Sequence, residues 1–377
     1  MAFWVFTVSF LFLFYIWAGY PTLLWLLRRC YNKNPVRQPL ERYPSVSIII
    51  AARNEEDKIA AKLIDYTNLD YPPDRLEVLI VSNNSRDRTE EIVREFAARD
   101  PRVRLFAGDG TLGKSGAQNL GVLSATGEFL FFTDADTRTR PETLQRLLEN
   151  FADPKVGLVT ANVHFGHPGN AVAEGQGMYW RFELFLRELE SELGILATGS
   201  GQSLLIRKEL YRPIPAIYGD DCVLPIDVRL QGYSVIQDNR VVVYDIMPNS
   251  IHGELRARAR MTARNWTGTL YRPAILNPLR FPLTSWALVS HKLLRWLTPY
   301  FLVMLLVANV ALCVRGEWIP ICCLQLAFYV AALIGWLRAR KGASAWVLGY
   351  PFAFCLANVG FLLGMTEVMR GQQTASY

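Results

Sequence analysis

Hydrophobic positions along the chain form short runs in one part and long runs in others. From residue 46 to residue 134, short apolar runs alternate with polar, helix-type stretches. Strands that alternate with helices at this spacing are typical of a parallel sheet with helices on both faces. We therefore predict an α/β fold, with strands at Val46–Ala52, Leu76–Val81, Val103–Phe106 and in the run that ends at Asp134.

Four apolar runs are long enough to cross a bilayer. They are Ala2–Leu27, Leu297–Val314, Trp318–Leu337 and Ala345–Gly364. The first run lacks the basic start and the small-residue cleavage site of a signal peptide, so we interpret it as an uncleaved anchor. The other three could form a buried helical subdomain, but their aromatic ends and scarcity of charge favour membrane spans.

These runs divide the chain into five parts. We predict an N-terminal transmembrane helix at 1–29, the α/β domain at 44–272, an interfacial helix region at 273–296, three transmembrane helices at 297–366 and a tail at 367–377. Phe281–Trp296 combines apolar residues with Lys292 and Arg295, which is typical of a helix at a membrane surface.

Basic residues predict the orientation of the spans. They follow the first span (Arg28, Arg29, Lys33, Arg37, Arg42) and the third (Arg338, Arg340, Lys341), and positive flanks stay on the cytoplasmic side. We therefore expect an integral membrane protein whose α/β domain is cytoplasmic. The net charge of +6 suits an anionic membrane and phosphate ligands. The chain has no nucleic-acid motif, so no nucleic acid partner is expected, and its six cysteines have no disulfide or zinc spacing.

Two carboxylates, Asp134 and Asp136, end the apolar run that starts after Glu128. Open α/β sheets bind ligands at the carboxyl ends of their strands. Neighbouring carboxylates repel each other unless a cation lies between them, and Mg²⁺ often combines one or two carboxylates with substrate phosphates. The pattern therefore predicts a seat for a metal and a diphosphate, although a solvated acidic turn would read the same way.

Seven motifs in order make the chain resemble the membrane-bound family 2 glycosyltransferases, which carry a GT-A domain. The motifs are Ala52-Arg53-Asn54-Glu55, Ser85-x-Asp87-x-Thr89, Gly113-Lys114 with Asn119, Asp134-Ala135-Asp136, Tyr179-Trp180-Arg181-Phe182-Glu183, Gly199-Ser200-Gly201 and Gly219-Asp220-Asp221. The resemblance runs from about Pro44 to about Leu270. It implies a Rossmann-like, mostly parallel sheet, a nucleotide-sugar donor, a divalent metal (Mn or Mg) and inversion at the anomeric carbon.

The resemblance also implies roles for four carboxylates. Asp136 would coordinate the metal, and Asp134 would bind the ribose or metal-bound water. Asp221 would be the catalytic base, since the family's second acidic residue has that role. Asp220 stands where the family usually has Glu, which puts its supporting role in doubt. Either aspartate could instead cap the helix that we predict at Val223–Leu230 after a strand-and-turn region at Ile214–Gly219.

The donor would contact residues from several motifs. The candidates are Ala52, Asn54, Glu55, Asn83, Asp87, Lys114, Asp134, Arg260 and Arg264. Many relatives have Asp where this chain has Asn83, so the base is open, and UDP is favoured only by its frequency in the family. Arg256, Arg260 and Arg264 share one face of a helix predicted at Glu254–Trp266. That face suits a diphosphate or lipid phosphates, or it is simply solvated.

The acceptor side would come from the later motifs. The candidates are Tyr179, Trp180, Glu183, Gly199, Ser200, Gly201 and Trp266. Flat rings stack on sugar faces, and glycine permits close backbone approach, but ordinary packing and a plain turn explain the same residues.

We therefore expect inverting transfer of a sugar to a lipid-linked or growing glycan at the cytoplasmic face of a membrane, by family the bacterial inner membrane. One alternative is a processive polysaccharide synthase that also exports its product. Another, from a different class, is an inactive sugar-nucleotide-binding scaffold or transporter. Processive relatives carry the motif Gln-x-x-Arg-Trp in this region, whereas here Asn265 separates Arg264 from Trp266. This departure favours addition of one or a few sugars, with export left to an oligomer or to separate export machinery.

Overall fold

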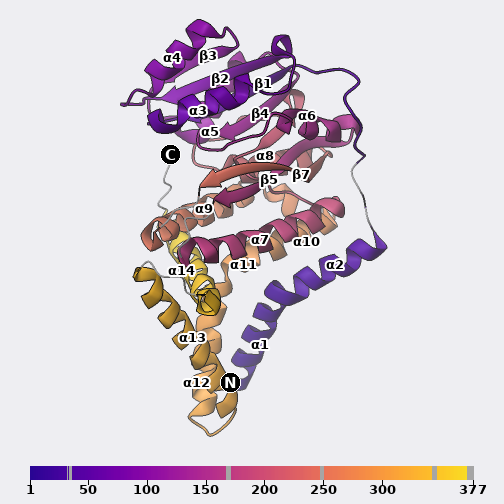
Figure 1. Cartoon of the computed structure of the whole chain (residues 1–377). Helices are drawn as coiled ribbons and strands as arrows, with labels where there is room; N and C mark the ends of the chain where they lie inside the picture. The colour runs from indigo at the N-terminus through magenta and orange to yellow at the C-terminus, as the bar shows by residue number, and fades with distance from the viewer. Residues whose placement is uncertain (32, 34–35, 167–170, 247–249, 342–345, 372–377) are drawn as a thin grey trace.

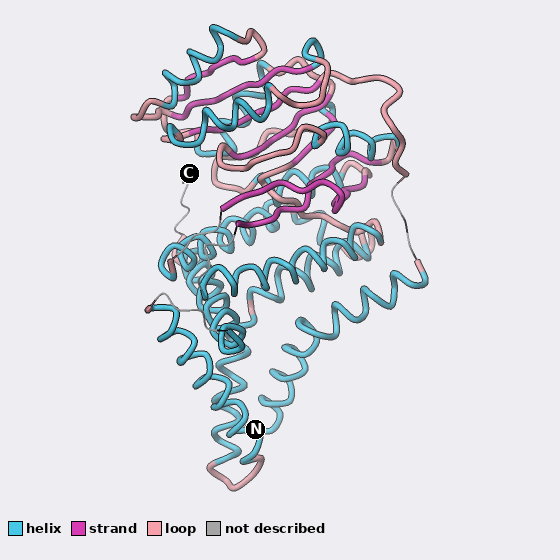
Figure 2. The backbone as a smooth tube through the Cα atoms, in the orientation of Figure 1, coloured by secondary structure: helices cyan, strands magenta, loops and turns pink. Residues whose placement is uncertain are grey.

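The computed structural model describes residues 1–31, 33, 36–166, 171–246, 250–341 and 346–371. A sheet with its covering helices forms one end of the molecule, and long helices form the other (Figure 1). Between the two ends lies a layer of helices that includes α7 (Ala171–Glu192) and α9 (Ile251–Tyr271). Figure 2 shows the strands gathered above this helical layer.

The sheet has seven strands in the order β3-β2-β1-β4-β6-β5-β7. The bounds are β1 Val46–Ala52, β2 Leu76–Asn83, β3 Val103–Gly108, β4 Phe129–Asp134, β5 Val156–Gly166, β6 Leu204–Arg207 and β7 Ser234–Ile246. Among the described strands, only β6 pairs antiparallel with its neighbours, β4 and β5. The mostly parallel sheet is thus confirmed. Because β6 runs backwards, the segment before it reaches the edge where β1, β2 and β4 end.

Alternate residues of the central strands fill two cores. Ile48 and Ile50 of β1 pack in one core with Ile59 of α3 (Glu56–Thr67) and Val93 of α4 (Thr89–Arg99). Ile49 lies on the other face, toward α5 (Gly113–Ser124) and α8 (Asp220–Leu230). Runs without alternation are expected when both faces of a parallel sheet are covered by helices. The two cores therefore hold the strand ends rigidly beneath the loops that follow them.

Two expectations for the segment before α8 are wrong. The residues between Ile214 and Gly219 form turns and no strand, and α8 begins at Asp220 instead of Val223. Pro213 and Pro215 have no backbone N–H to give to a sheet, which explains the missing strand. The earlier helix start places both aspartates of the Gly219-Asp220-Asp221 motif in the first turn of α8.

Among the residues that the structure describes, three helices are long and apolar enough to cross a membrane. They are the continuous helix Ala2–Cys30 (α1, η1 and α2), α13 (Ile319–Arg340) and α14 (Gly349–Met369). A fourth span results if Pro282–Trp296 (α10, η6, α11) and α12 (Thr298–Cys313), which are bent by 57°, count as one. The chain therefore has four spans only if the helix predicted to lie at the membrane surface, Phe281–Trp296, forms one broken span together with α12.

Helix α14 packs along α9, close to the sheet. A side chain at Gly360 would meet the aliphatic part of Arg258, and one at Gly364 would meet the backbone of Ala259. Small residues at such positions let two helix backbones approach closely. A candidate membrane span thus lies directly against the helix that carries the arginine face.

Candidate active site

A cavity of about 500 Å³ opens at the sheet edge where β1 and β4 end. Its walls come from the strand ends, the segment 199–202, α8, α9, α7 and the helices 292–296 and α14. Of the predicted site residues, Glu55, Lys114, Asp134, Asp136, Tyr179, Trp180, Glu183, Gly199, Ser200, Gly201, Asp220, Asp221, Arg260 and Arg264 line it. The motifs are far apart in sequence, yet the fold brings most of them to one hollow.

Lys114 joins the two acidic motifs. Its Nζ lies 2.6 Å from Asp134 Oδ1 and 3.2 Å from Asp220 Oδ2. Gln118, one turn further along α5, donates from Nε2 to Asp220 Oδ2 at 2.7 Å. A side chain at Gly201 would lie 3.1 Å from Lys114 Nζ, so glycine leaves room for the bridge. Lys114 is therefore an internal counter-ion of both aspartates.

The neighbours Asp220 and Asp221 have opposite electrostatic environments. Burial raises the pKa of Asp221, and the charge of Asp220 raises it further. Burial acts on Asp220 as well, but Lys114 and Gln118 hold its pKa below the usual value. Asp220 therefore favours its charged form, and Asp221 holds a proton more readily than an ordinary aspartate does. Helix capping by either side chain is not observed: Gly219 is the N-cap.

Asp136 and Glu55 share Lys58. Lys58 Nζ lies 3.2 Å from Glu55 Oε2 and 3.5 Å from Asp136 Oδ2. Asp134 and Asp136 are both half-buried and line the cavity. Within the described residues, no group of three or more His, Cys, Asp or Glu could hold a metal ion. Asp134 and Asp136 would supply two oxygen ligands to an ion, which would need its remaining ligands from a donor diphosphate and water.

Lys62 lies completely buried beneath the Asp134–Asp136 turn. Its Nζ donates to Thr133 Oγ1 at 2.9 Å and to the carbonyl of Thr137 at 2.5 Å. Burial lowers the pKa of Lys62 to about 7, although the two aspartates oppose that change. Sequence patterns did not single out this residue, which fixes the turn from below.

The donor candidates in the first two loops brace each other. Asn54 Oδ1 accepts from the amide of Arg86 at 2.8 Å, and Asp87 accepts from the amides of Glu56 and Thr89, each at 3.1 Å. Burial alone would raise the pKa of Asp87, but these bonds and the Thr89 hydroxyl hold it below its usual value. In this structure, Asn54 and Asp87 shape the loops around the cavity.

Asn83 ends β2 with one half of its side chain engaged. Its Oδ1 accepts from the amide of Gly110 at 2.9 Å, whereas its Nδ2 is buried with no hydrogen-bond partner in the described structure. Ala52, another donor candidate, points into the core, and its neighbour Ala51 lines the cavity instead. Alternate residues of a strand face opposite sides, so the Ala52 side chain is unavailable to a ligand there.

The arginines of α9 do not act as one face. Arg260 and Arg264 line the cavity, and Arg264 Nη2 donates to the carbonyl of Tyr218 at 2.9 Å. Arg256 is exposed and lies 2.8 Å from His252 Nε2 through its Nη2. Burial lowers the pKa of Arg260, and Arg264 lowers it further. Two of the three predicted arginines therefore reach the site.

The acceptor candidates divide into two groups. Ser200 lies in the cavity wall, where its Oγ accepts from Arg187 Nη1 at 2.7 Å. Tyr179 and Trp180 also line the wall. Trp266 does not; it packs against Trp296 with ring centroids 6.0 Å apart. Its role in the structure is to support the wall.

Glu183 lies at the centre of a buried ionic cluster. Its carboxylate binds Arg187 at 2.8 Å, His291 at 3.0 Å and Lys292 at 2.6 Å, and also binds Arg295. Burial would raise the pKa of Glu183, but Arg295 and Lys292 hold it well below its usual value. Both carboxylate oxygens are thus engaged by the protein itself.

The same cluster reaches the first span. Glu190 accepts from Tyr20 Oη at 2.6 Å and lies 2.7 Å from His291 Nδ1. Lys292 and Arg295, which the sequence placed on a surface helix, are buried. No local pattern marked them, because their partners on α7 are about a hundred residues away. The sequence likewise gave no signal for Arg187 or Arg258 at the cavity.

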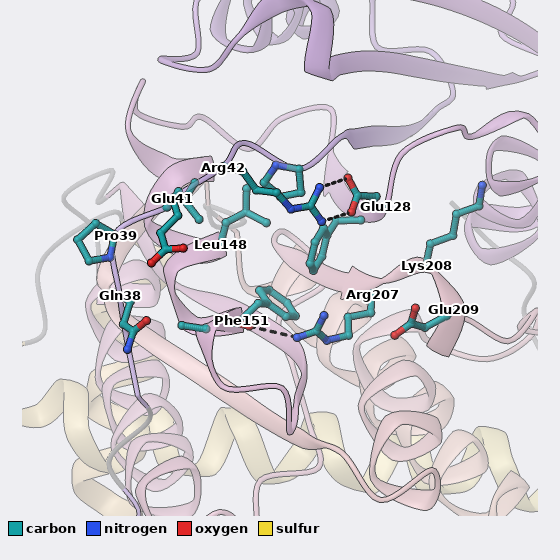
Figure 3. A pocket seen from close by; sticks show the side chains of 14 residues that line it. Gln38, Pro39, Glu41, Arg42, Glu128, Leu148, Phe151, Arg207, Lys208 and Glu209 are labelled. Carbon is teal, nitrogen blue, oxygen red and sulfur yellow. Dashed lines mark hydrogen bonds and ion pairs between the residues drawn. The ribbon is translucent and has the colours of Figure 1, made fainter.

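A second hollow of about 770 Å³ lies away from these carboxylates (Figure 3). The segment 38–42 forms one wall, and Figure 3 shows Arg42 directed at Glu128 and Arg207 at Phe151. Glu128 precedes β4, at the end of the sheet opposite Asp134. We assign the active site to the smaller cavity because the carboxylates and cations of separate motifs converge there.

Comparison with known proteins agrees with this assignment. Residues 47–214 match the family model described as Glycosyl transferase family 2. The chain carries a glycosyl transferase family 2 domain. The matched residues include the strand ends, Lys114, Asp134 and the Gly199–Gly201 segment, and they end before Asp220 and Asp221.

Relatives of the glycosyltransferase domain match over part of their length. "Glycosyltransferase AglE" of Haloferax volcanii is 34% identical over 130 residues, which are 34% of this chain and 43% of that protein. "Beta-monoglucosyldiacylglycerol synthase" of Synechocystis sp. is 29% identical over 203 residues, which are 51% of this chain and 42% of that protein. The chain thus spans less than half of either relative.

One solved structure resembles the whole chain. A mannosyltransferase from Pyrobaculum calidifontis, solved in complex with GDP-Man and Mn²⁺, covers 98% of this chain and 99% of its own, with a TM-score of 0.76 and 22% identity. At that identity the likeness establishes the fold, including the helices outside the glycosyltransferase domain.

Proposed function

We propose that this protein transfers a sugar from a nucleotide-sugar to a membrane-bound acceptor, with inversion at the anomeric carbon. The observation that carries the proposal is the placement of Asp134 and Asp136 in one cavity with Asp221, linked through Lys114 and Asp220. The leaving diphosphate needs metal-binding carboxylates and the attacking hydroxyl needs a base, and the two must lie a short distance apart.

The donor would lie over the ends of β1, β2 and β4. A divalent metal held by Asp134 and Asp136 supplies charge neutralisation to the diphosphate when it is bound. Arg260 and Arg264 face the same space and would bind phosphate oxygens. The unpartnered Asn83 Nδ2 is available for a polar group of the nucleoside. The neighbour that binds GDP-Man makes GDP a candidate beside UDP.

Asp221 would be the general base. Its raised pKa gives the carboxylate more affinity for the proton of an acceptor hydroxyl than an exposed aspartate has. A single base that activates the hydroxyl on the face opposite the leaving group gives inversion. Asp220 would keep Lys114 in place and would not itself take the proton.

The acceptor would enter from the membrane side. Phe361 of α14 and Trp296 line the cavity, and α14 is a candidate span. A lipid-linked acceptor on the cytoplasmic face of a bacterial inner membrane is therefore the substrate that we propose, with residues 44–272 as catalytic domain.

Donor hydrolysis tests the proposal. Purified full-length protein in detergent is incubated with a panel of UDP- and GDP-sugars with Mn²⁺ or Mg²⁺, and free nucleotide is measured. We expect metal-dependent release from one sugar class and a loss of about a hundredfold or more in Asp136→Ala. Release from no donor, or equal release without metal, would contradict the proposal.

A further inference from the structure

One end of the active-site cavity, formed by residues of α7, α9 and the helices 292–296, has more cations than carboxylates. Four buried cations of the lining, Arg187, Arg258, Lys292 and Arg295, share two buried carboxylates as ion-pair partners, Glu183 and Glu254. Counting Glu190, which binds His291 and Tyr20 behind this wall, cations still outnumber carboxylates. Excess buried charge is costly unless a partner is present.

Arg295 has unused hydrogen-bonding capacity at this end. Its side chain is only 2% exposed, and its Nη2 binds Glu183. Its Nε and Nη1 are buried and have no partner in the described part of the chain. Buried guanidinium nitrogens without partners are rare, and a planar guanidinium is suited to bind a phosphate through two nitrogens.

Arg258 and Arg295 approach the same aromatic ring. The guanidinium carbons lie 4.2 Å and 5.3 Å from the centroid of the Tyr179 ring. Arg258 pairs with Glu254 and Arg295 pairs with Glu183, so the two guanidinium groups are held close to the same ring by carboxylates on separate helices. Lys292 lies on the Asp221 side of the group, because both residues line a small adjoining cavity.

The wall next to these cations is apolar and belongs to the helical end of the molecule. Phe361 and Trp296 lie in this wall, and Met365 packs against them. Phe361 and Met365 are on α14, which is apolar enough to span a membrane. A ligand that fills this end must therefore present an anionic group and a hydrocarbon group side by side.

We propose that this end of the cavity, the membrane-end subsite, binds a phosphate group that belongs to the lipid part of the acceptor. The subsite rests on the proposed function, whose acceptor it specifies as an anionic lipid in place of a neutral one. The phosphate lies between Arg258 and Arg295, the hydrocarbon chain of the lipid follows α14, and the hydroxyl that accepts the sugar lies past Lys292, toward Asp221.

Binding of dodecyl phosphate tests the subsite without turnover. Full-length protein in a neutral maltoside detergent is titrated by calorimetry with dodecyl phosphate, with dodecanol and with inorganic phosphate. We expect saturable binding of dodecyl phosphate, at least tenfold weaker binding of inorganic phosphate and none of dodecanol. Equal binding of the two phosphates would mean a free-phosphate site and would overturn the lipid assignment.

Variants separate this site from surface attraction. Arg295→Met should weaken dodecyl phosphate binding about tenfold or more, whereas Arg340→Met, at an exposed arginine at the end of α13, should leave it unchanged. Arg295→Lys keeps a cation beside Glu183 and should give an intermediate loss, which retains the test if the methionine variant does not fold. Unchanged binding in both Arg295 variants would overturn the proposal.

Donor hydrolysis distinguishes the two proposals. Hydrolysis without dodecyl phosphate binding would reject the subsite and keep the transferase. Dodecyl phosphate binding without hydrolysis of any nucleotide-sugar would reject the transferase as proposed.

Discussion

Lys114 Nζ lies 2.6 Å from Asp134 Oδ1, so the lysine of one motif neutralises the first aspartate of another. The same ammonium is 3.2 Å from Asp220. Asp134 and Asp220 hold the pKa of Lys114 above its usual value against the effect of burial. The donor-side and base-side carboxylates are therefore one electrostatic unit.

Lys114→Met should remove the cation that both carboxylates share. We expect donor binding to weaken and transfer to fall about a hundredfold or more, the scale for losing one preorganised electrostatic contact. Calorimetry with nucleotide and Mn²⁺, together with turnover, measures both effects. Lys155→Met, at an exposed lysine, is the matched control. Normal donor affinity and turnover in Lys114→Met would remove Lys114 from the mechanism.

Asp136→Ala should abolish transfer and weaken Mn²⁺-dependent nucleotide binding. The fold should survive, because Asp136 is half-buried beyond the end of β4 and contributes little to either core. Calorimetry with nucleotide at several Mn²⁺ concentrations measures the loss, with exposed Asp57→Ala as control. Metal-dependent binding that matches the wild type would exclude this aspartate as a ligand.

Asp221→Asn should retain donor binding and lose transfer by about a hundredfold or more, as expected for a general base. Initial rates and donor affinity separate the two. The linkage in the product should be inverted relative to the donor, which NMR of the anomeric proton detects. A retained configuration would rule out the single-base mechanism.

Transfer should fall at low pH as Asp221 becomes protonated. Because burial and Asp220 raise the pKa of Asp221, the acidic limb of kcat/KM should lie above the usual aspartate value of about 4. Asp220→Asn removes the adjacent negative charge, so the limb should move to lower pH. A shift to higher pH, or no shift, would show that the acidic limb of kcat/KM does not report the protonation of Asp221 beside Asp220.

Products should carry one or a few added sugars. A polymer crossing the bilayer needs a polar path between helices, because its hydroxyls cannot face lipid without cost. Three or four candidate spans form little wall for such a path in one chain. Mass spectrometry of products made in lipid nanodiscs should show short additions; a ladder of long polymer from donor alone would favour the synthase alternative.

The first four strands and their ends could be predicted because their signals are local. Each apolar run is bounded by polar turns, and ligand residues of parallel strands gather at one edge. Strand β6 was not predicted, and neither were β5 and β7, which pair with each other. Their pairing is long-range and has two register irregularities, and local patterns carry no information about such partners.

The buried cations were missed for a related physical reason. Lys292 and Arg295 have the sequence context of a surface helix, yet Glu183 on α7 compensates their charge inside the protein. Burial of a charge depends on a partner, not on neighbours in sequence. Conversely, Trp266 and Ala52 lie in motifs, but Trp266 packs against Trp296 and Ala52 lies in the core. The direction of a side chain follows from the fold and not from the motif.

Gly360 and Gly364 allow α14 to close against α9, and this has a consequence for the time at which the site becomes complete. Phe361 is the last residue along the chain to line the cavity. During synthesis, the carboxylates and Lys114 emerge long before the wall that separates them from lipid. The nascent chain therefore passes through a stage in which its acidic centre exists without its apolar wall, and the packing of α14 against α9 ends that stage.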